Sequence, residues 1–137
     1  MDSNTHKLKI LIVDDETELA GLFGTRLQAE GYEVQQCDNG ETALATARSY
    51  KPDLILLDLM MPRLSGFDAI ELFRNTLETS ASKIIVLSAL SQPADMEKTK
   101  SLGADGYIVK SDNTIGEVVA QVKAVLEASE EDTGLPV

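Results

Sequence analysis

Five short segments of strand length alternate along this 137-residue chain with longer stretches of helical period, and this alternation most narrows the folds open to it. The expected strands are residues 8–13, 33–37, 54–57, 83–87 and 106–109. Four of the five are nearly continuous runs of Ile, Leu and Val, which is typical of strands covered by helices on both faces. The second, 33–37, is polar and is therefore predicted to lie at an edge of the sheet.

The stretches between the expected strands repeat apolar residues at the spacing of amphipathic helices. In the first helix these positions are Leu19, Leu22, Phe23 and Leu27; in the second, Ala43, Leu44 and Ala47; in the third, Phe67, Ile70, Leu72 and Phe73. A fourth helix is expected over 96–102 and a fifth over 114–128. Five β/α units joined by right-handed crossovers predict a doubly wound α/β fold, in which a parallel sheet lies between two layers of helices.

The length suits one domain, which we place at residues 7–128. Residues 1–6 are expected to be a flexible N-terminus, and the acidic segment 129–137 a disordered tail. The single cysteine, Cys37, excludes an internal disulfide and fits a reducing compartment. The start of the chain lacks the apolar segment of a signal peptide, and no apolar run approaches the roughly 20 residues of a membrane helix. We therefore expect a cytoplasmic protein.

The charge of the chain narrows the choice of partner. Lys and Arg number 12 against 23 Asp and Glu, so the formal net charge is −11. Binding to nucleic acid or to an anionic membrane surface relies on clustered cations, which this balance disfavours. We therefore expect neither as a direct partner.

Polar residues directly follow four of the expected strands: Asp14 and Asp15, Asp58, Ser88, and Lys110. Because the carboxyl ends of parallel strands meet at one edge of a sheet, we expect these side chains to lie together. Three neighbouring carboxylates stay ionised only if cations neutralise them, and Lys110 supplies one positive charge. A hard divalent cation, Mg²⁺ with Mn²⁺ as a substitute, would supply the rest. Such a site has the parts for phosphoryl transfer, with a carboxylate as the covalent acceptor and Ser88 as a hydrogen-bond donor.

The same residues stand in motifs that resemble the response-regulator receiver domain of two-component signalling, in a single-domain form. The matching segments are Asp14-Asp15, Asp58-Leu59-Met60-Met61-Pro62-Arg63-Leu64-Ser65-Gly66, Ser88-Ala89 and Gly103-Ala104-Asp105-Gly106-Tyr107-Ile108-Val109-Lys110. The resemblance extends over residues 7–128. It implies a flavodoxin-like receiver fold, with five helices and a five-stranded parallel sheet in the order 2-1-3-4-5.

The resemblance also implies roles for individual residues. Asp58 would accept a phosphoryl group from the phosphohistidine of a sensor histidine kinase or phosphotransfer protein, and would later lose it by hydrolysis. Asp15, Asp58 and the Met60 carbonyl would bind Mg²⁺, with Asp14 holding the metal through water. Lys110 and Ser88 would contact the phosphoryl group. Tyr107 would turn inward as Ser88 moves, so that the face of helix four, strand five and helix five changes its affinity for a downstream protein or a second copy of the chain.

Two features depart from the family pattern. Ser111 follows Lys110 where the family commonly has proline, often after a cis bond, and a cis bond before serine would be about 3 kcal/mol less favourable than trans. Met60 and Leu90, each two residues past a site residue, are both apolar where many members carry a polar residue. We expect this apolar pair to exclude water and to slow loss of the phosphoryl group.

Three other functions fit the sequence less well. A haloacid-dehalogenase-like phosphatase needs a second Asp two residues after its nucleophile, and Met60 occupies that position. A flavodoxin-like cofactor carrier needs a Gly/Ser/Thr phosphate loop after the first strand, where Asp14-Asp15-Glu16 would repel phosphate. The remaining alternative is a receiver-like docking module that acts without phosphorylation.

Overall fold

Five parallel strands form the centre of the molecule, in the order β2-β1-β3-β4-β5. The computed structural model describes residues 7–134, with side chains as far as Ala128. The strands are β1 (Lys9–Val13), β2 (Glu33–Cys37), β3 (Leu54–Leu57), β4 (Lys83–Ser88) and β5 (Gly106–Val109). The helices are α1 (Thr17–Ala29), α2 (Gly40–Tyr50), α3 (Gly66–Arg74), α4 (Pro93–Leu102) and α5 (Ile115–Gly134), with a short 3-10 helix η1 at Lys110–Asp112. The predicted doubly wound α/β fold, its strand order and its five helices are confirmed.

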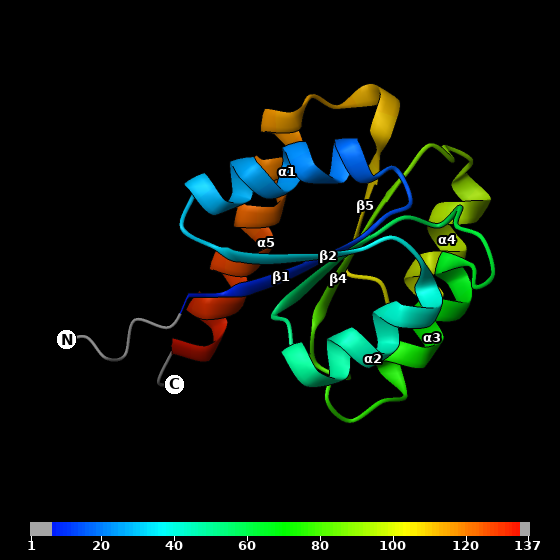
Figure 1. Cartoon of the computed structure of the whole chain (residues 1–137), viewed down its shortest axis with the longest axis horizontal. Coiled ribbons are helices and arrows are strands. Elements are labelled where there is room, and N and C mark those ends of the chain that lie inside the picture. The colour runs from blue at the N-terminus through cyan, green and yellow to red at the C-terminus, as the bar shows by residue number, and fades with distance from the viewer. Residues whose placement is uncertain (1–6, 135–137) are drawn as a thin grey trace.

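Helices cover both faces of the sheet: α1 and α5 lie on one face, and α2, α3 and α4 on the other (Figure 1). In β1, Ile10 and Ile12 belong to the cluster formed with α1 and α5, whereas Leu11 and Val13 belong to the cluster formed with α2 and α3. Both faces of the strand are therefore dry. Each such buried aliphatic side chain stabilises the fold by about 1.5–3 kcal/mol, which explains why the central strands are nearly continuous apolar runs.

The polar strand β2 lies at an edge of the sheet, as predicted. Among the strands that the structure describes it pairs only with β1, from Lys9 opposite Glu33 to Val13 opposite Cys37. Three of its five side chains are exposed, and Val34 and Cys37 are half-buried. An edge strand needs fewer apolar residues because one of its sides has no neighbouring strand.

The helices differ in how firmly their side chains hold them to the core. α5 buries Val118, Val119, Val122 and Leu126 against the sheet. α4 buries a single side chain, Thr99. Leu22 and Leu72, which share the apolar spacing of α1 and α3, are 54% and 39% exposed.

The last helix continues beyond its predicted end. α5 runs to Gly134, so residues 129–134, expected to belong to a disordered tail, are helical. Glutamates are good helix formers, and adding residues to an existing helix requires no new nucleation. Residues 1–6 and 135–137, the remaining segments expected to be flexible or disordered, lie outside the described residues. Within the part of the chain that is described, none of the helices has both the length and the apolar composition that crossing a bilayer requires.

Candidate functional site

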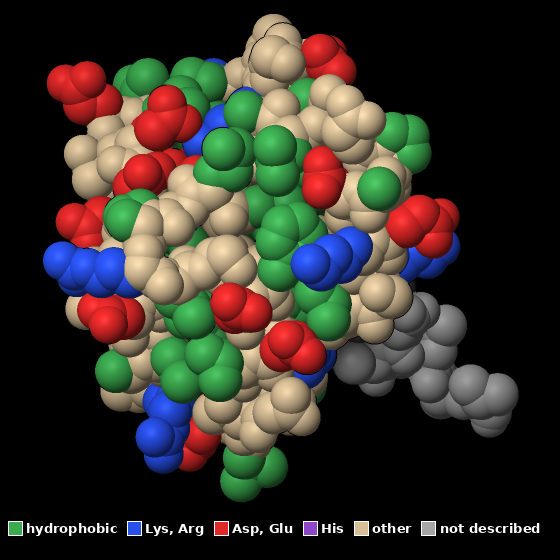
Figure 2. Space-filling model, turned by 90° about the vertical axis from the view of Figure 1, so that its right-hand side faces the viewer, with side chains coloured by type: hydrophobic (Ala, Val, Ile, Leu, Met, Phe, Trp, Pro, Cys, Tyr) green, Lys and Arg blue, Asp and Glu red, His purple; other side chains and the backbone are tan. Residues whose placement is uncertain are grey.

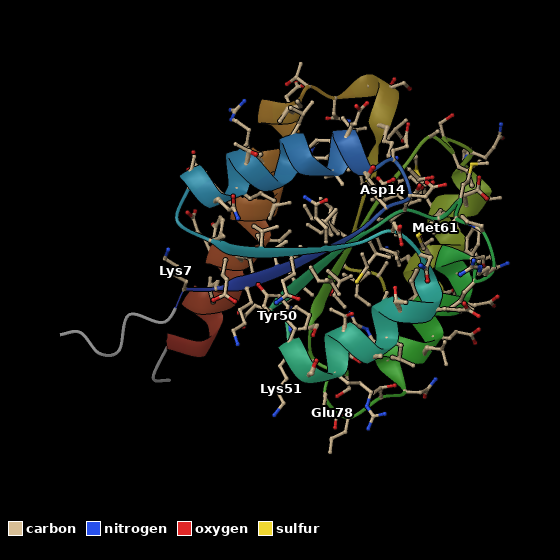
Figure 3. All side chains as sticks on the ribbon, viewed as in Figure 1. Lys7, Asp14, Tyr50, Lys51, Met61 and Glu78 are labelled. Carbon is tan, nitrogen blue, oxygen red and sulfur yellow. The ribbon has the colours of Figure 1, made fainter. Side chains whose placement is uncertain are left out.

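Three carboxylates gather at the end of the sheet where the strands terminate. Asp14, Asp15 and Asp58 each present an oxygen, and these oxygens all lie within 4.8 Å of one another. Asp14 and Asp58 are 2% and 5% exposed, whereas Asp15 is exposed to solvent. In Figure 3, Asp14 lies at the same end of the molecule as Met61 of the β3–α3 loop, opposite the end that carries Lys51. The predicted convergence of these carboxylates is therefore present in the fold.

The two buried carboxylates are held by the backbone around them. The Asp58 N–H donates to the Val13 carbonyl at 2.9 Å, which continues the pairing of β3 with β1 up to the site. Asp58 Oδ1 accepts the Met60 N–H at 3.2 Å, and Asp14 Oδ1 accepts the Glu16 N–H at 2.9 Å. One oxygen of each carboxylate therefore accepts a loop N–H, and the other oxygen of each faces the ammonium of Lys110.

Lys110, the first residue of η1, brings a positive charge to this cluster. Its Nζ lies 2.9 Å from Asp14 Oδ2 and 3.6 Å from Asp58 Oδ2, and its side chain is 12% exposed. Nζ also donates to Glu16 Oε1, at the N-terminus of α1. The sequence prediction gave Glu16 no part in the site, although Glu16 directly follows the acidic pair.

The electrostatics of the cluster follow from burial and crowding. Burial raises the pKa of Asp58 to about 6, the Met60 N–H opposes this rise, and the charge of Asp14 adds to it. For Lys110, burial alone would lower the pKa, but the hydrogen bonds to Glu16 and Asp14 outweigh it and raise the pKa above its ordinary value. Four carboxylates against one ammonium leave a formal charge of −3 if all are ionised.

The donor set fits a hard divalent cation. The three clustered side chains offer only carboxylate oxygens, which are the ligands that Mg²⁺ and Mn²⁺ prefer. The unneutralised negative charge would be offset by such an ion. The residues present are therefore suited to Mg²⁺, as the sequence predicts.

The loop after Asp58 is packed so tightly that one position admits only glycine. A Cβ on Gly66, the first residue of α3, would lie 2.5 Å from both the Asp58 carbonyl oxygen and the Leu59 Cα. This close approach brings α3 against the end of β3, and Ser65 caps the helix by accepting the Asp68 N–H at 3.2 Å. Met60, in the same loop, has a side chain that is 56% exposed. The part predicted for its carbonyl as a metal ligand stays a prediction.

Ser88 and Tyr107 are linked through the backbone of one residue. Ser88 is fully buried at the end of β4, and its Oγ accepts the Leu90 N–H at 3.2 Å. The hydroxyl of Tyr107, half-buried on β5, donates to the Leu90 carbonyl at 2.7 Å. The sequence prediction paired Ser88 with Tyr107 but missed the contribution of Leu90, because no spacing in the sequence reveals a contact made by a loop backbone.

The peptide bond after Lys110 is not cis, unlike the bond that many family members have at this position. The Lys110–Ser111 bond is trans, as is each peptide bond of the described residues. Lys110–Asp112 form one turn of 3-10 helix, and the Asn113 side chain donates to the Val109 carbonyl at 2.9 Å. A serine after Lys110 is thus accommodated in a trans turn.

Comparisons with known proteins agree with this geometry. The family model for the response regulator receiver domain matches residues 10–123. The transcriptional regulatory protein ResD of Bacillus subtilis is 42% identical over 122 residues, which are 89% of this chain and 49% of ResD. The DNA-binding dual master transcriptional regulator RpaA of Synechocystis sp. is 35% identical over 122 residues, which are 89% of this chain and 50% of RpaA. The chain thus spans about half the length of these curated relatives.

Solved structures share the fold over most of the chain. The chemotaxis protein CheY4 of Vibrio cholerae superposes with a TM-score of 0.82 at 28% identity, covering 88% of this chain and 99% of that one. A CheY-like receiver domain protein from Methanospirillum hungatei gives a TM-score of 0.85 at 25% identity, covering 93% of this chain and 99% of that one. Aspartate phosphorylation and Mg²⁺ binding are standard for this family. With its sheet order, its clustered carboxylates and these matches, the chain belongs to the response regulator receiver domain family of two-component signalling.

Proposed function

We propose that this chain is a phosphoacceptor switch in which Asp58 takes a phosphoryl group from the phosphohistidine of a sensor histidine kinase or phosphotransfer protein. The observation that carries the proposal is the position of the Asp58 carboxylate, grouped with those of Asp14 and Asp15 and 3.6 Å from the ammonium of Lys110. A carboxylate with an adjacent cation and a potential metal site is the arrangement that phosphoryl transfer to an aspartate needs.

Phosphoryl transfer to Asp58 is a displacement at phosphorus. An oxygen of Asp58 attacks phosphorus, the P–N bond of the phosphohistidine breaks, and the imidazole nitrogen keeps the electron pair and takes up a proton. The product is an acyl phosphate on Asp58. Lys110 would offset negative charge on the phosphoryl oxygens, and Ser88 would donate a hydrogen bond to one of them. Hydrolysis of the acyl phosphate returns the switch to its resting state.

Asp15, Asp58 and the Met60 carbonyl would hold the Mg²⁺ ion. Asp14 would contact it through water, because its two oxygens already accept the Glu16 N–H and the Lys110 ammonium. When bound, the ion neutralises charge on the phosphoryl oxygens. Bringing an anionic phosphoryl group next to this cluster is otherwise opposed by its carboxylates.

The conformational change would be transmitted from Ser88 to Tyr107 through the backbone of Leu90. If the Ser88 hydroxyl turns to a phosphoryl oxygen, its Oγ gives up the Leu90 N–H, and the Leu90 carbonyl that holds Tyr107 is freed to move. Tyr107 then turns inward and alters the face formed by α4, β5 and α5. That is a two-state element biased by a local charge event.

A protein is the partner that this surface favours. Figure 2 shows the side of the molecule that lies on the right in Figure 1, where hydrophobic side chains run across the middle with acidic and basic side chains around them. The net charge of −11 disfavours nucleic acid as a direct ligand of this domain. ResD and RpaA are named as transcriptional regulators, so an output on gene expression through another protein segment, or through a second copy of this chain, fits the family. The free Cys37 suits a cytoplasmic location.

Acetyl phosphate tests the proposal directly. The protein is incubated with this small phosphodonor, with and without Mg²⁺, and its intact mass is measured. We expect a gain of one phosphate that requires Mg²⁺ and is abolished in Asp58→Asn. Uptake that persists in the variant would place the acceptor elsewhere. No uptake by the wild-type protein would favour the alternative, a docking module that acts without phosphorylation.

A further inference from the structure

Glu16 makes a contact at the site for which the proposed function has no use. Its carboxylate accepts a hydrogen bond from Lys110 Nζ, the same ammonium that is to meet the phosphoryl group. Lys110 Nζ is also bonded to Asp14 at 2.9 Å, but it lies 3.6 Å from Asp58 Oδ2, beyond hydrogen-bond length. In the structure the Lys110 ammonium therefore donates hydrogen bonds to Asp14 and Glu16 and not to Asp58, the proposed phosphoryl acceptor.

The two partners of Lys110 differ in how easily they can release it. Asp14 is 2% exposed, so losing the ammonium would leave a buried charge without compensation. The Glu16 side chain is 59% exposed, so water can replace Lys110 at its carboxylate. The exchangeable contact is therefore the one with Glu16.

We propose that Glu16 is a latch that holds the Lys110 ammonium in the resting state and releases it when a phosphoryl group occupies Asp58. The proposal rests on the function proposed above. Glu16 touches neither reacting atom and acts through Lys110, so it is a positioning residue. Its effect is to oppose phosphorylation, since the contacts with Asp14 and Glu16 hold Nζ 3.6 Å from Asp58 Oδ2, and a shift toward a phosphoryl group on Asp58 weakens the contact with Glu16.

The chain offers a matched control in the same helix. Glu18 is also exposed and lies in the first turn of α1, but the ion pairs of Lys110 within the described residues do not include it. Glu16→Gln and Glu18→Gln remove the same charge from nearly the same place. A difference between them therefore reports the contact with Lys110 rather than the general field of the acidic surface.

The first measurement is the affinity for beryllofluoride, a phosphoryl analogue, at saturating Mg²⁺. We expect Glu16→Gln to bind it about two- to fivefold more tightly than the wild-type protein, because an ion pair with one exposed partner contributes little. The rate of phosphorylation by acetyl phosphate, in which Asp58 attacks phosphorus and acetate leaves with the bonding electrons, should rise by a similar factor. Glu18→Gln should match the wild-type protein in both assays.

The second measurement follows the latch itself by ¹³C NMR of the glutamate side-chain carboxyl groups. In the wild-type protein with Mg²⁺, adding beryllofluoride should move the Glu16 carboxyl signal toward that of solvated Glu18. An unmoved Glu16 signal, weaker or unchanged beryllofluoride binding by Glu16→Gln, or an equal gain in Glu18→Gln would overturn the latch. A wild-type protein that binds no beryllofluoride and takes up no phosphate would instead overturn the proposed function, and the latch with it.

Discussion

The buried carboxylate of Asp58 makes folding dependent on pH when no cation is bound. Its pKa is 3.8 in an unfolded reference and about 6 in the fold, chiefly because burial penalises the charged form. Well below pH 3.8 the group is neutral in both states and has no effect. As the pH rises from there to about 6, the unfolded chain loses the proton first, so the free energy of unfolding falls, in total by something on the order of 3 kcal/mol.

Asp58→Asn should therefore stabilise the metal-free protein at neutral pH. With a chelator present, we expect urea denaturation at pH 7 to give a free energy of unfolding about 1–3 kcal/mol above the wild-type value, because the variant buries no charge. Near pH 4 the two proteins should have nearly equal stability. Asp15→Asn, which alters an exposed carboxylate, is the control and should have a smaller effect. A variant less stable than the wild-type protein at pH 7 would contradict this account of Asp58.

The apolar pair Met60 and Leu90 should set the lifetime of the phosphorylated form. Met60 is 56% exposed and Leu90 is half-buried against the core, so neither side chain is sealed from solvent. Met60→Asn and Leu90→Glu introduce groups that hydrogen-bond water, and we expect each to shorten the phosphoryl half-life several-fold. The half-life is measured by loss of the phosphate mass after the phosphodonor is removed, with Met60→Leu as the apolar control. An unchanged half-life in both polar variants would show that water reaches the site by another route.

The sequence reveals those site residues that the ends of the strands position, and it misses those positioned by side-chain reach or by a loop backbone. Asp14, Asp58 and Lys110 follow apolar strands directly, so the fold alone brings them together once the strands are parallel. Glu16 meets Lys110 from 94 residues away through the reach of two long side chains, which spacing along a chain does not encode. Leu90 contributes backbone atoms, for which the identity of the residue carries no signal.

At the scale of the elements, one arginine joins three segments at the end of the sheet opposite the site. Arg74, the last residue of α3, donates from Nε and Nη2 to the Gly103 carbonyl at 3.0 and 2.8 Å, and from Nη1 to the Ser82 carbonyl at 2.6 Å. Nη2 also pairs with Asp105 at 2.9 Å, and the same Asp105 oxygen accepts the Ile84 N–H. This joint fixes the C-terminal end of α4, a helix with little buried surface of its own.

Removing the joint should weaken the whole fold. We expect Arg74→Ala to lower the free energy of unfolding by about 2–4 kcal/mol, because several carbonyls and a carboxylate lose a charged donor. Arg48→Ala is the control: its pair with the half-buried Glu78 is a single contact at 3.4 Å from an exposed arginine, and its loss should change stability by less than about 0.5 kcal/mol. Urea denaturation of both variants decides the matter, and equal effects would mean that Arg74 does not join the segments energetically.

The elements were predictable where burial dictates composition. Strands β1, β3 and β4 bury both faces, so their apolar runs mark them to within a residue. Helical periodicity was less specific, since Leu22 and Leu72 fit the apolar spacing of their helices although they are 54% and 39% exposed. The end of α5 was missed because residues 129–134 carry no apolar periodicity, and the helix there extends a segment that is already nucleated.

For the molecule as a whole, Mg²⁺ should stabilise the native state. A ligand that binds only the folded protein adds about 2.7 kcal/mol to the free energy of unfolding at 100 times its dissociation constant. We expect such a rise in the wild-type protein and a smaller one in Asp15→Asn at the same Mg²⁺ concentration. Asp53→Asn is the control, since Asp53 precedes β3 at the opposite end of the sheet and accepts the Lys9 N–H there. In Asp53→Asn the rise in the free energy of unfolding on adding Mg²⁺ should equal that of the wild-type protein, even if the variant is less stable without Mg²⁺. An undiminished increment in Asp15→Asn would argue against Asp15 as a ligand.

Because α4 buries little of its surface, it should open locally more often than the strands of the sheet. α4 fully buries only Thr99, and Arg74 and Leu102 hold its C-terminal end, so its N-terminal turns can separate from the sheet while both hydrophobic clusters stay closed. Its amide hydrogens should therefore exchange with deuterated solvent well before those of β1 or β3, through local opening rather than global unfolding. A partner that binds α4 and displaces it would therefore have to supply only the small free energy of local opening, and not the free energy of unfolding of the whole domain.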